Sequence, residues 1–250
     1  MSNATIKYYY IEPYLKELNA KVIDIIDNKI VLDKTIAYAE GGGQESDRGV
    51  FVIGDREIEF YDVQKGVGKN LYLENFPVIS VETPIYHYIN SKDLKYFKKN
   101  QEVKIKIDTL RRAKLSISHS AIHFVLMVIE KRLPGYENRI YGAKIKEDGA
   151  RLDFKTTLKF DANFIKSLED EVNLIISKNL PIKTYTHKKH QEAWYWECNG
   201  YICPCGGTHI DNSKYIKKVF LKRKNLGKNG QRISLTYEAY DFFQERFYSE

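Results

Sequence analysis

Cysteine is scarce in this sequence: Cys198, Cys203 and Cys205 are the only three among 250 residues. An odd number clustered this closely does not provide a disulfide framework, and it indicates a reducing compartment with metal binding as the first interpretation. Long apolar runs are also missing. The longest, about residues 121–129, is interrupted by His123 and falls well short of the roughly 20 residues that span a bilayer. The first twenty residues contain no continuous apolar stretch, so we expect no signal peptide, no membrane partner and a cytoplasmic location.

The chain does have enough apolar residues, 43%, to build a proper core. Lys and Arg outnumber Asp and Glu by 40 to 33, which gives a net charge of +7. Such an excess is compatible with a polyanionic partner but does not require one. The strongest concentration of basic residues is the segment Lys214–Arg232, which is a candidate RNA contact, although a charged run is more often a solvated face.

The first hundred residues show many short β-type segments separated by turns, with little helical pattern. This organisation predicts a small β-barrel of about a hundred residues. A tight turn is expected at Asp27-Asn28. The expected strands cover residues 21–26, 29–32, 35–39, 50–53, 57–63 and 103–107.

A helix of some 25 residues is expected after Asp108, a capping residue, with an apolar stripe on one face and an end at Pro134-Gly135. Asp161 is expected to cap a second helix. Gly227 and Gly230 suggest a hairpin between two basic strands near the C-terminus.

Four side chains can form a tetrahedral metal site. His119 and His123 are four apart and lie on one face of the expected long helix. Cys205 and His209 can close the site from a turn, and one thiolate with three imidazoles suits Zn²⁺. The histidine pair alone is weak evidence, because ordinary core histidines have the same spacing. Ser120 stands where a zinc protease would need a glutamate beside the first histidine, which disfavours that class.

Other cysteines and histidines leave alternatives open. Cys203 and Cys198 are close enough in sequence to replace Cys205 as the sulfur ligand. His187 and His190 form a second possible pair, but their spacing in a basic loop gives little reason to prefer them.

The stretch Gly41-Gly42-Gly43-Gln44 frees the backbone for a close approach to a ligand. It is not a phosphate-binding P-loop, because no Lys-Ser/Thr pair follows at the required spacing. On its own it is more simply a flexible turn.

Taken in order, these motifs resemble the freestanding alanyl-tRNA editing proteins, the AlaX family, which are similar to the editing domain of alanyl-tRNA synthetase. The resemblance rests on Glu40–Gln44, His119-x-x-x-His123, Arg151-x-Asp153-Phe154 and Cys205-Gly-Gly-Thr-His209. It covers most of the chain and fits the medium-sized form. Ala39 stands where the pattern would have proline and Ser120 where threonine is more usual, but neither change removes a ligand.

The resemblance implies an α+β protein in which residues 1–107 form the barrel and residues 108–250 form a zinc-containing α+β editing domain of the threonyl/alanyl-tRNA synthetase type. It implies a zinc-dependent aminoacyl-tRNA deacylase that acts on mischarged tRNA(Ala), with serine as the expected wrong amino acid and glycine also accepted. Zn²⁺ would be held by His119, His123, Cys205 and His209, with Gln44 as the catalytic residue. The expected substrate-binding residues are Gly42, Gly43, Arg151, Asp153 and Thr208. The alternatives are a non-catalytic zinc-stabilised tRNA-binding module and a deacylase for a different aminoacyl-tRNA.

Overall fold

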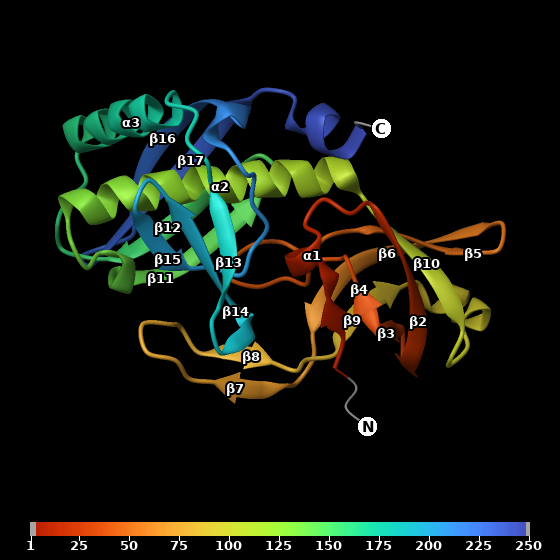
Figure 1. Ribbon diagram of the computed structural model, residues 1–250. Coiled ribbons are helices and arrows are strands. Elements are labelled where there is room, and N and C mark those ends of the chain that lie inside the picture. Colours follow the sequence, from red (N-terminus) through yellow and green to blue (C-terminus); the bar gives the residue numbers. More distant parts are fainter. Residues whose placement is uncertain (1–3, 249–250) are drawn as a thin grey trace.

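The computed structural model describes residues 4–248 and consists of two bodies joined by one long helix (Figure 1). The N-terminal body is a closed barrel whose buried apolar side chains form a core of their own. The C-terminal body packs strands around helix α2 (Thr109–Arg132) and has a second, larger core. A mixed architecture with a barrel at its N-terminal end confirms this part of the predicted fold class.

The barrel is closed by six antiparallel strands in the order β10-β2-β3-β9-β6-β5. Alternate residues of a strand point inward, so Ile85, His87 and Ile89 are all buried. Asp27 takes a φ of 51° in the turn between β2 and β3, where a tight turn was predicted. The six strands are Glu17–Ile26 (β2), Lys29–Leu32 (β3), Gly49–Ile53 (β5), Arg56–Lys65 (β6), Ile85–Ile89 (β9) and Glu102–Ile107 (β10).

The predicted strand at residues 35–39 is wrong over most of its length. Only Lys34–Thr35 (β4) pairs, with the short parallel strand Ile6–Lys7 (β1). The following residues are buried in the barrel core, but their backbone groups bond to side chains rather than to a neighbouring strand. The Tyr38 N–H, for example, donates to Asp47 Oδ2 at 2.7 Å. A short helix at Tyr8–Ile11 (α1) was not predicted.

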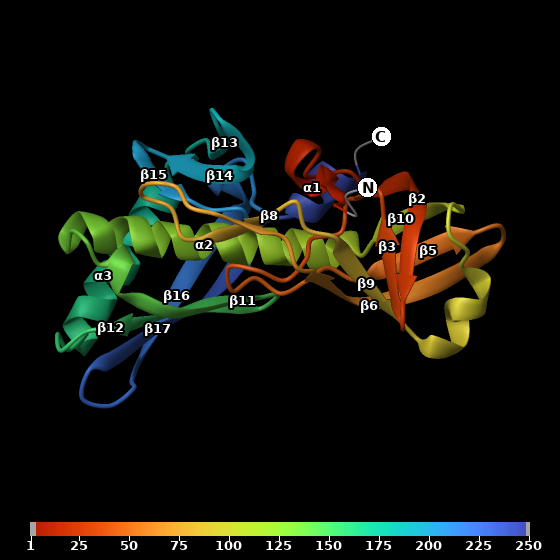
Figure 2. The same ribbon diagram turned by 90° about the horizontal axis from the view of Figure 1, so that it is seen from below.

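Helix α2 begins where the sequence indicated, because the Asp108 side chain accepts a hydrogen bond of 3.0 Å from the Arg111 N–H. Its burial was underestimated. Nearly every residue from Arg111 to Ile129 is buried, since one sheet lies on each side of the helix (Figure 2). By length and composition alone α2 could cross a membrane, but 89% of its most apolar window is buried inside the fold. It is therefore the central core helix of the C-terminal body.

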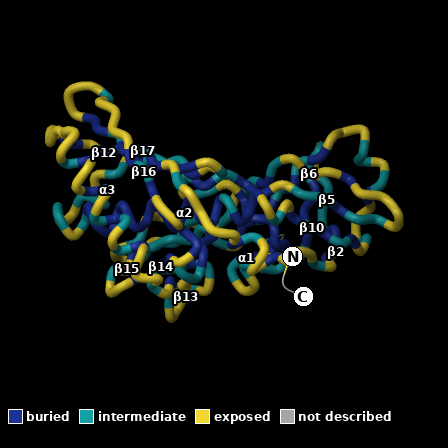
Figure 3. Tube along the Cα trace, turned by 90° about the horizontal axis from the view of Figure 1, so that it is seen from above, coloured by how far each residue is buried: buried dark blue, intermediate teal, exposed yellow. Residues whose placement is uncertain are grey.

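The larger sheet of this body has the order β11-β12-β17-β16, and helix α3 (Ala162–Ile176) packs against β16 and α2. Asp161 caps α3 as predicted, accepting from the Phe164 N–H at 2.8 Å. The predicted basic hairpin is confirmed as β16–β17, and its exposed tip projects from the molecule (Figures 2 and 3). The smaller sheet is β13-β14-β15. The strands are Ile140–Lys146 (β11), Gly149–Lys155 (β12), Lys183–His187 (β13), His190–Cys198 (β14), Tyr201–Pro204 (β15), Ile216–Asn225 (β16) and Gly230–Ala239 (β17).

An unpredicted hairpin, β7 (Lys69–Leu71) and β8 (Ile79–Val81), leaves the barrel and reaches the smaller sheet of the other body (Figures 1 and 2). At its tip the Phe76 ring packs edge-on against Tyr195, with centroids 4.9 Å apart. The two bodies are thus in contact away from α2 as well. Short 3₁₀ turns lie at Ser91–Tyr96, Glu137–Arg139 and Ser213–Tyr215, and a π-helical turn at Gln244–Tyr248.

Candidate active site

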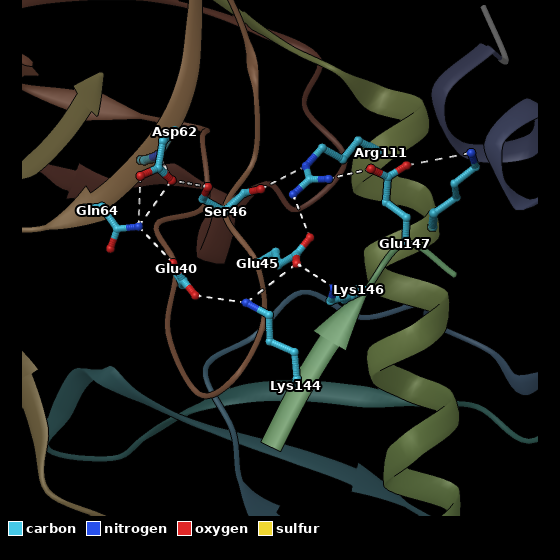
Figure 4. A network of polar contacts seen from close by, with 11 residues as sticks. Glu40, Glu45, Ser46, Asp62, Gln64, Arg111, Lys144, Lys146 and Glu147 are labelled. Atoms are coloured by element: carbon cyan, nitrogen blue, oxygen red, sulfur yellow. Dashed lines mark hydrogen bonds and ion pairs between the residues drawn. The ribbon is translucent and has the colours of Figure 1, made fainter. Parts of the chain in front are cut away.

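The glycine-rich loop belongs to the barrel by sequence but is held by charges of the C-terminal body (Figure 4). On α2, Arg111 donates to the Ser46 carbonyl at 3.0 Å and to Glu45 at 3.1 Å. From β11, Lys144 pairs with Glu40 at 3.2 Å and with Glu45 at 3.6 Å. The loop is therefore fixed from two directions rather than left as a flexible turn.

A buried ion pair secures the base of the same loop. Arg112 and Asp47 are 1% and 0% exposed, and the guanidinium forks onto both carboxylate oxygens. The same guanidinium also donates to the carbonyl groups of Pro13 and Ile36. The sequence alone assigned no role to Arg112, so this structural role is a new observation.

Backbone contacts then bring Gln44 against the centre of the second body. The Ile145 N–H donates to the Gly43 carbonyl at 2.8 Å, and the Glu45 N–H donates to the Ile145 carbonyl at 3.1 Å. Gly43 has a φ of +86°, and a Cβ there would lie 2.8 Å from the Ala143 backbone. Only glycine fits this approach of the loop to β11.

The four predicted ligands converge. The ligand atoms of His119, His123, Cys205 and His209 all lie within 4.8 Å of one another. Cys205 Sγ lies 3.5 Å from His119 Nε2, 3.3 Å from His123 Nε2 and 3.3 Å from His209 Nε2. One sulfur and three imidazole nitrogens facing a common point are a donor set that suits Zn²⁺, so these residues fit the metal that the sequence implied.

Each of the three histidines has a separate partner for its other ring nitrogen. His119 Nδ1 lies 2.7 Å from Gln44 Oε1, His123 Nδ1 lies 3.5 Å from Cys203 Sγ, and His209 Nδ1 lies 3.4 Å from Ser120 Oγ. An amide oxygen can only accept, so His119 carries its proton on Nδ1 and presents the Nε2 lone pair. Partners of this kind fix the ring orientation of metal-binding histidines.

Two of these partners were not anticipated in this role. Cys203 contacts the Nδ1 edge of the His123 ring, on the side away from Cys205, so its position is that of an orienting group rather than an alternative ligand. Ser120 follows His119 on α2, which turns its hydroxyl toward His209, and it also accepts from the Ile210 N–H at 3.1 Å. No local sequence pattern reveals these partners, because they come from a different part of the chain.

Burial favours the protonation states that metal binding requires of the histidines. It lowers the pKa of His123 to about 3, and burial together with the neighbouring histidines lowers those of His119 and His209. Burial also raises the pKa of the Cys205 thiol to about 12, so without a metal the sulfur keeps its proton. The three imidazoles are neutral ligands, and the thiol must release a proton when a metal binds.

The remaining candidates lie elsewhere. The rings of His187 and His190 lie on the β13–β14 hairpin with centroids 5.4 Å apart and are not part of the ligand group. Cys198 is buried as a free thiol and belongs to the hydrophobic core.

A cavity of about 270 Å³ opens beside the ligand group. Three of the ligands, His119, His123 and Cys205, form part of its wall, and Gly42 lines it as well. Apolar side chains of α2, β11 and β12 form another part of the wall, among them Ile122, Leu126, Ile140, Ile145 and Leu152. The arrangement places a metal-binding cluster at the side of a partly apolar chamber, which is the usual form of a small-molecule site.

Gln44 and Thr208 lie behind the ligands and not in this cavity. Gln44 is 0% exposed, and its Oε1 accepts from the Thr208 N–H at 2.9 Å in addition to His119. Its Nε2 donates to Thr208 Oγ1 at 2.9 Å, and Ser116 Oγ donates to the same hydroxyl at 3.0 Å. The expected catalytic residue Gln44 is thus placed to orient His119, and Thr208 is placed to hold Gln44.

Arg151 and Asp153 are not brought to the cavity either. Leu152, between them on β12, lines the cavity, so its neighbours face the other side of the sheet. There Asp153 pairs with Arg151 and accepts from Arg232 Nε at 2.6 Å. Gly43 is held against Ala143 and is likewise outside the lining. Of the five expected substrate-binding residues, the structure places Gly42 in the cavity wall.

The stretch that supplies two of the four candidate ligands is similar to a known protein family. Residues 196–234 match the family described as the threonyl and alanyl tRNA synthetase second additional domain, a stretch that contains Cys205 and His209. Over 249 residues the chain is 30% identical to the alanyl-tRNA editing protein AlaX-M of Pyrococcus horikoshii, covering 95% of this chain and 100% of the relative. This chain belongs to the AlaX family. AlaX-M of Methanosarcina barkeri is also 30% identical, over 91% of this chain and 97% of its own length.

A larger relative gives the family its context. The alanine–tRNA ligase of Pyrococcus furiosus is 29% identical to 89% of this chain, but the match covers only 24% of the ligase. The AlaX fold described above therefore corresponds to about a quarter of that enzyme.

Proposed function

We propose that this protein is a trans-editing hydrolase that deacylates mischarged tRNA(Ala) in the cytoplasm, with Zn²⁺ as its metal and serine as the principal wrong amino acid. Glycine is the second expected substrate. One observation carries the proposal: three imidazole nitrogens and one sulfur converge at the wall of a partly apolar cavity. The names and full-length similarity of the AlaX-M relatives support the tRNA(Ala) substrate.

The chemistry required is modest, because an aminoacyl ester is already labile. A bound Zn²⁺ would supply Lewis-acid chemistry that activates water or polarises an ester carbonyl. The residues of the chain provide the geometry: Gln44, Ser120 and Cys203 orient the three imidazoles from behind. Ile122 and Leu126 on the same helix offer an apolar wall against which the acyl end can be held.

The basic hairpin is the second element of the proposal. Lys222, Arg223, Lys224 and Lys228 are exposed at and near its projecting tip (Figure 3). Phosphate contacts supply sequence-independent affinity for RNA, and a projecting basic hairpin can reach the phosphate backbone of an RNA helix. We assign the segment Lys214–Arg232 to binding the body of the tRNA, away from the cavity.

The test is a deacylation panel with Ser-, Gly- and Ala-tRNA(Ala), each run with zinc and with a chelator. The expected result is metal-dependent hydrolysis of Ser-tRNA(Ala) first, Gly-tRNA(Ala) second and Ala-tRNA(Ala) least. His123→Ala should abolish the activity, whereas His187→Ala, which removes a histidine outside the ligand group, should leave it unchanged. Binding of tRNA(Ala) without hydrolysis would instead identify a non-catalytic zinc module. Full activity in the chelator would refute the metal-dependent reaction, and preference for another aminoacyl-tRNA would refute the substrate.

A further inference from the structure

Part of the cavity lining carries charged side chains, unlike the apolar wall described above. Three charged side chains outside the ligand group line the cavity, namely Lys7, Lys65 and Glu192. Glu192 is the only carboxylate among the described lining residues, so two ammonium groups face one carboxylate. The charged side therefore has one positive charge that nothing in the lining balances.

The unbalanced charge is on Lys65. Glu192 is engaged on both oxygens, since Oε2 forms an ion pair with the buried Lys7 and Oε1 accepts from the Glu82 N–H at 2.7 Å. Within residues 4–248 no hydrogen bond or ion pair joins the Lys65 ammonium to another residue. Burial, with a further contribution from Lys7 and partly offset by the attraction of Glu192, lowers the pKa of Lys65. A cation held in this position costs stability unless a ligand compensates it.

Lys65 is also next to the turn that delivers Gln44. A Cβ at Gly41 would lie 3.4 Å from Lys65 Nζ. Gly41 and Gln44 exchange backbone hydrogen bonds of 3.0 and 3.2 Å, and Gln44 contacts the ligand His119. The ammonium and three residues of the metal-binding cluster line the same cavity, so a substrate end at the metal site would lie within the same chamber.

An aromatic pair lines the same cavity. Tyr10 and Trp194 both line it and are stacked, with centroids 5.0 Å apart and planes at 15°. Aromatic faces beside a cation are the combination that proteins use for single-stranded nucleic-acid ends.

We propose that Lys65 binds the phosphodiester of the terminal nucleotide when the acceptor end of an aminoacyl-tRNA occupies the cavity, an assignment that rests on the proposed function. The chemistry of that end leaves one choice. Its ester, ribose and base are uncharged and its amino group is neutral or cationic, so the phosphodiester is its only anion. Lys65 is then a substrate-binding residue that positions the ester, and the Tyr10–Trp194 pair is the adjacent surface for a base.

The experiment compares two substrates that differ by the phosphate. One is Ser-tRNA(Ala), and the other is 2′(3′)-O-seryladenosine, which carries the same ester without a phosphate. For Lys65→Met we expect about a tenfold rise in KM for the tRNA, as for loss of one charged hydrogen bond, with kcat within about twofold of wild type. The salt slope of log KM should fall by about 1, the amount of one phosphate contact. Hydrolysis of seryladenosine should not change.

Two further variants control the comparison. Lys65→Arg should retain most of the tRNA affinity, because it keeps the cation. Lys166→Met, which removes an exposed lysine of α3 far from the cavity lining, should behave as wild type on both substrates. Lys65→Met should unfold at the wild-type temperature or above, since within residues 4–248 the ammonium forms no hydrogen bond or ion pair that the substitution would break, so a KM effect is not explained by poor folding.

Other outcomes would overturn the proposal. An unchanged KM and salt slope in Lys65→Met would show that no phosphate is bound, and an equal loss on seryladenosine would show a structural role instead. If wild-type protein does not deacylate Ser-tRNA(Ala), the proposed function fails. The phosphate contact is then judged from the salt dependence of binding, measured by fluorescence anisotropy with a CCA-ended RNA minihelix that carries no amino acid. Lys65→Met must again lower the slope of log Kd against log salt concentration by about one unit.

Discussion

Replacing Gln44 with methionine should weaken metal binding without touching a ligand. The side chain keeps nearly the same length but loses its amide, which takes part in three hydrogen bonds. His119 Nδ1–H and the Thr208 N–H would then be buried donors without an acceptor. Each such group costs about 1–3 kcal/mol, so we expect the variant to be about 2–4 kcal/mol less stable when part of the loss is relieved by relaxation.

The metal-specific part of this effect follows from the tautomer. With Gln44 in place the proton of His119 is held on Nδ1 and Nε2 faces the other ligands. Without it the ring can rotate or move its proton to Nε2, where it would block the metal. Loss of such an orienting partner typically lowers metal affinity 10–100-fold, which corresponds to about 1.4–2.7 kcal/mol.

The assay is zinc affinity by competition with a calibrated chelator, alongside the thermal unfolding midpoint of the metal-free protein. Gln44→Glu is the matched control, because a carboxylate still accepts from both His119 and the Thr208 N–H, and it should retain affinity close to wild type. Deacylation at saturating zinc should recover much of the activity of Gln44→Met. Wild-type zinc affinity in Gln44→Met would refute the orienting role of Gln44.

Three further results are expected. Cys205→Ser should reduce zinc affinity by orders of magnitude and Cys203→Ser by at most about 100-fold, because only the first removes a ligand; equal losses in a chelator titration would contradict this assignment. Gly207→Ala should disrupt the site, since a Cβ there would collide with the His119 ring and lie 2.9 Å from Gln44 Oε1, and normal metal binding would show that the turn can move. In the barrel, burial lowers the pKa of His87 to about 4, so stability is retained above its unfolded pKa near 6.5 and is lost as pH falls toward 4. Denaturant unfolding at pH 7 and pH 4.5 should show a loss smaller by about 2–3 kcal/mol in His87→Gln, and equal losses in the two proteins would refute this origin.

The parts of the fold that could be predicted are those that local pattern encodes. Strand periodicity and turns indicated the barrel, and Asp108 and Pro134-Gly135 indicated both ends of α2. The strand prediction failed at residues 35–39 because backbone N–H groups of this buried apolar run donate to the side chains of Thr35 and Asp47 and not to a neighbouring strand. The hairpin β7–β8 was missed because its strands are only three residues each and its apolar contacts are with the other body.

The four ligands converged as the sequence suggested, since their side-chain types and spacing are themselves the signal. Their supporting groups could not be predicted in the same way. Gln44 contacts Thr208 across 164 positions, and Cys203 contacts His123 across 80. The first contact depends on how the two bodies pack and the second on how α2 packs against β15, and no sequence periodicity encodes either. Arg151 and Asp153 show the opposite case. A sequence motif predicted them as substrate-binding residues, but strand alternation turns them away from the cavity.

The crossing of the glycine-rich loop from one body to the other has a consequence for cooperativity. The metal ligands all belong to the C-terminal body, yet the group that fixes His119 comes from a loop continuous with the barrel. Part of the free energy released when a metal binds His119 would therefore also stabilise the contact between the glycine-rich loop and the C-terminal body. Metal uptake should slow amide exchange not only around α2 but also at residues 40–48, and melting of the barrel should release the metal. A metal bound by these ligands would therefore be thermodynamically linked to the barrel, from which none of its ligands comes.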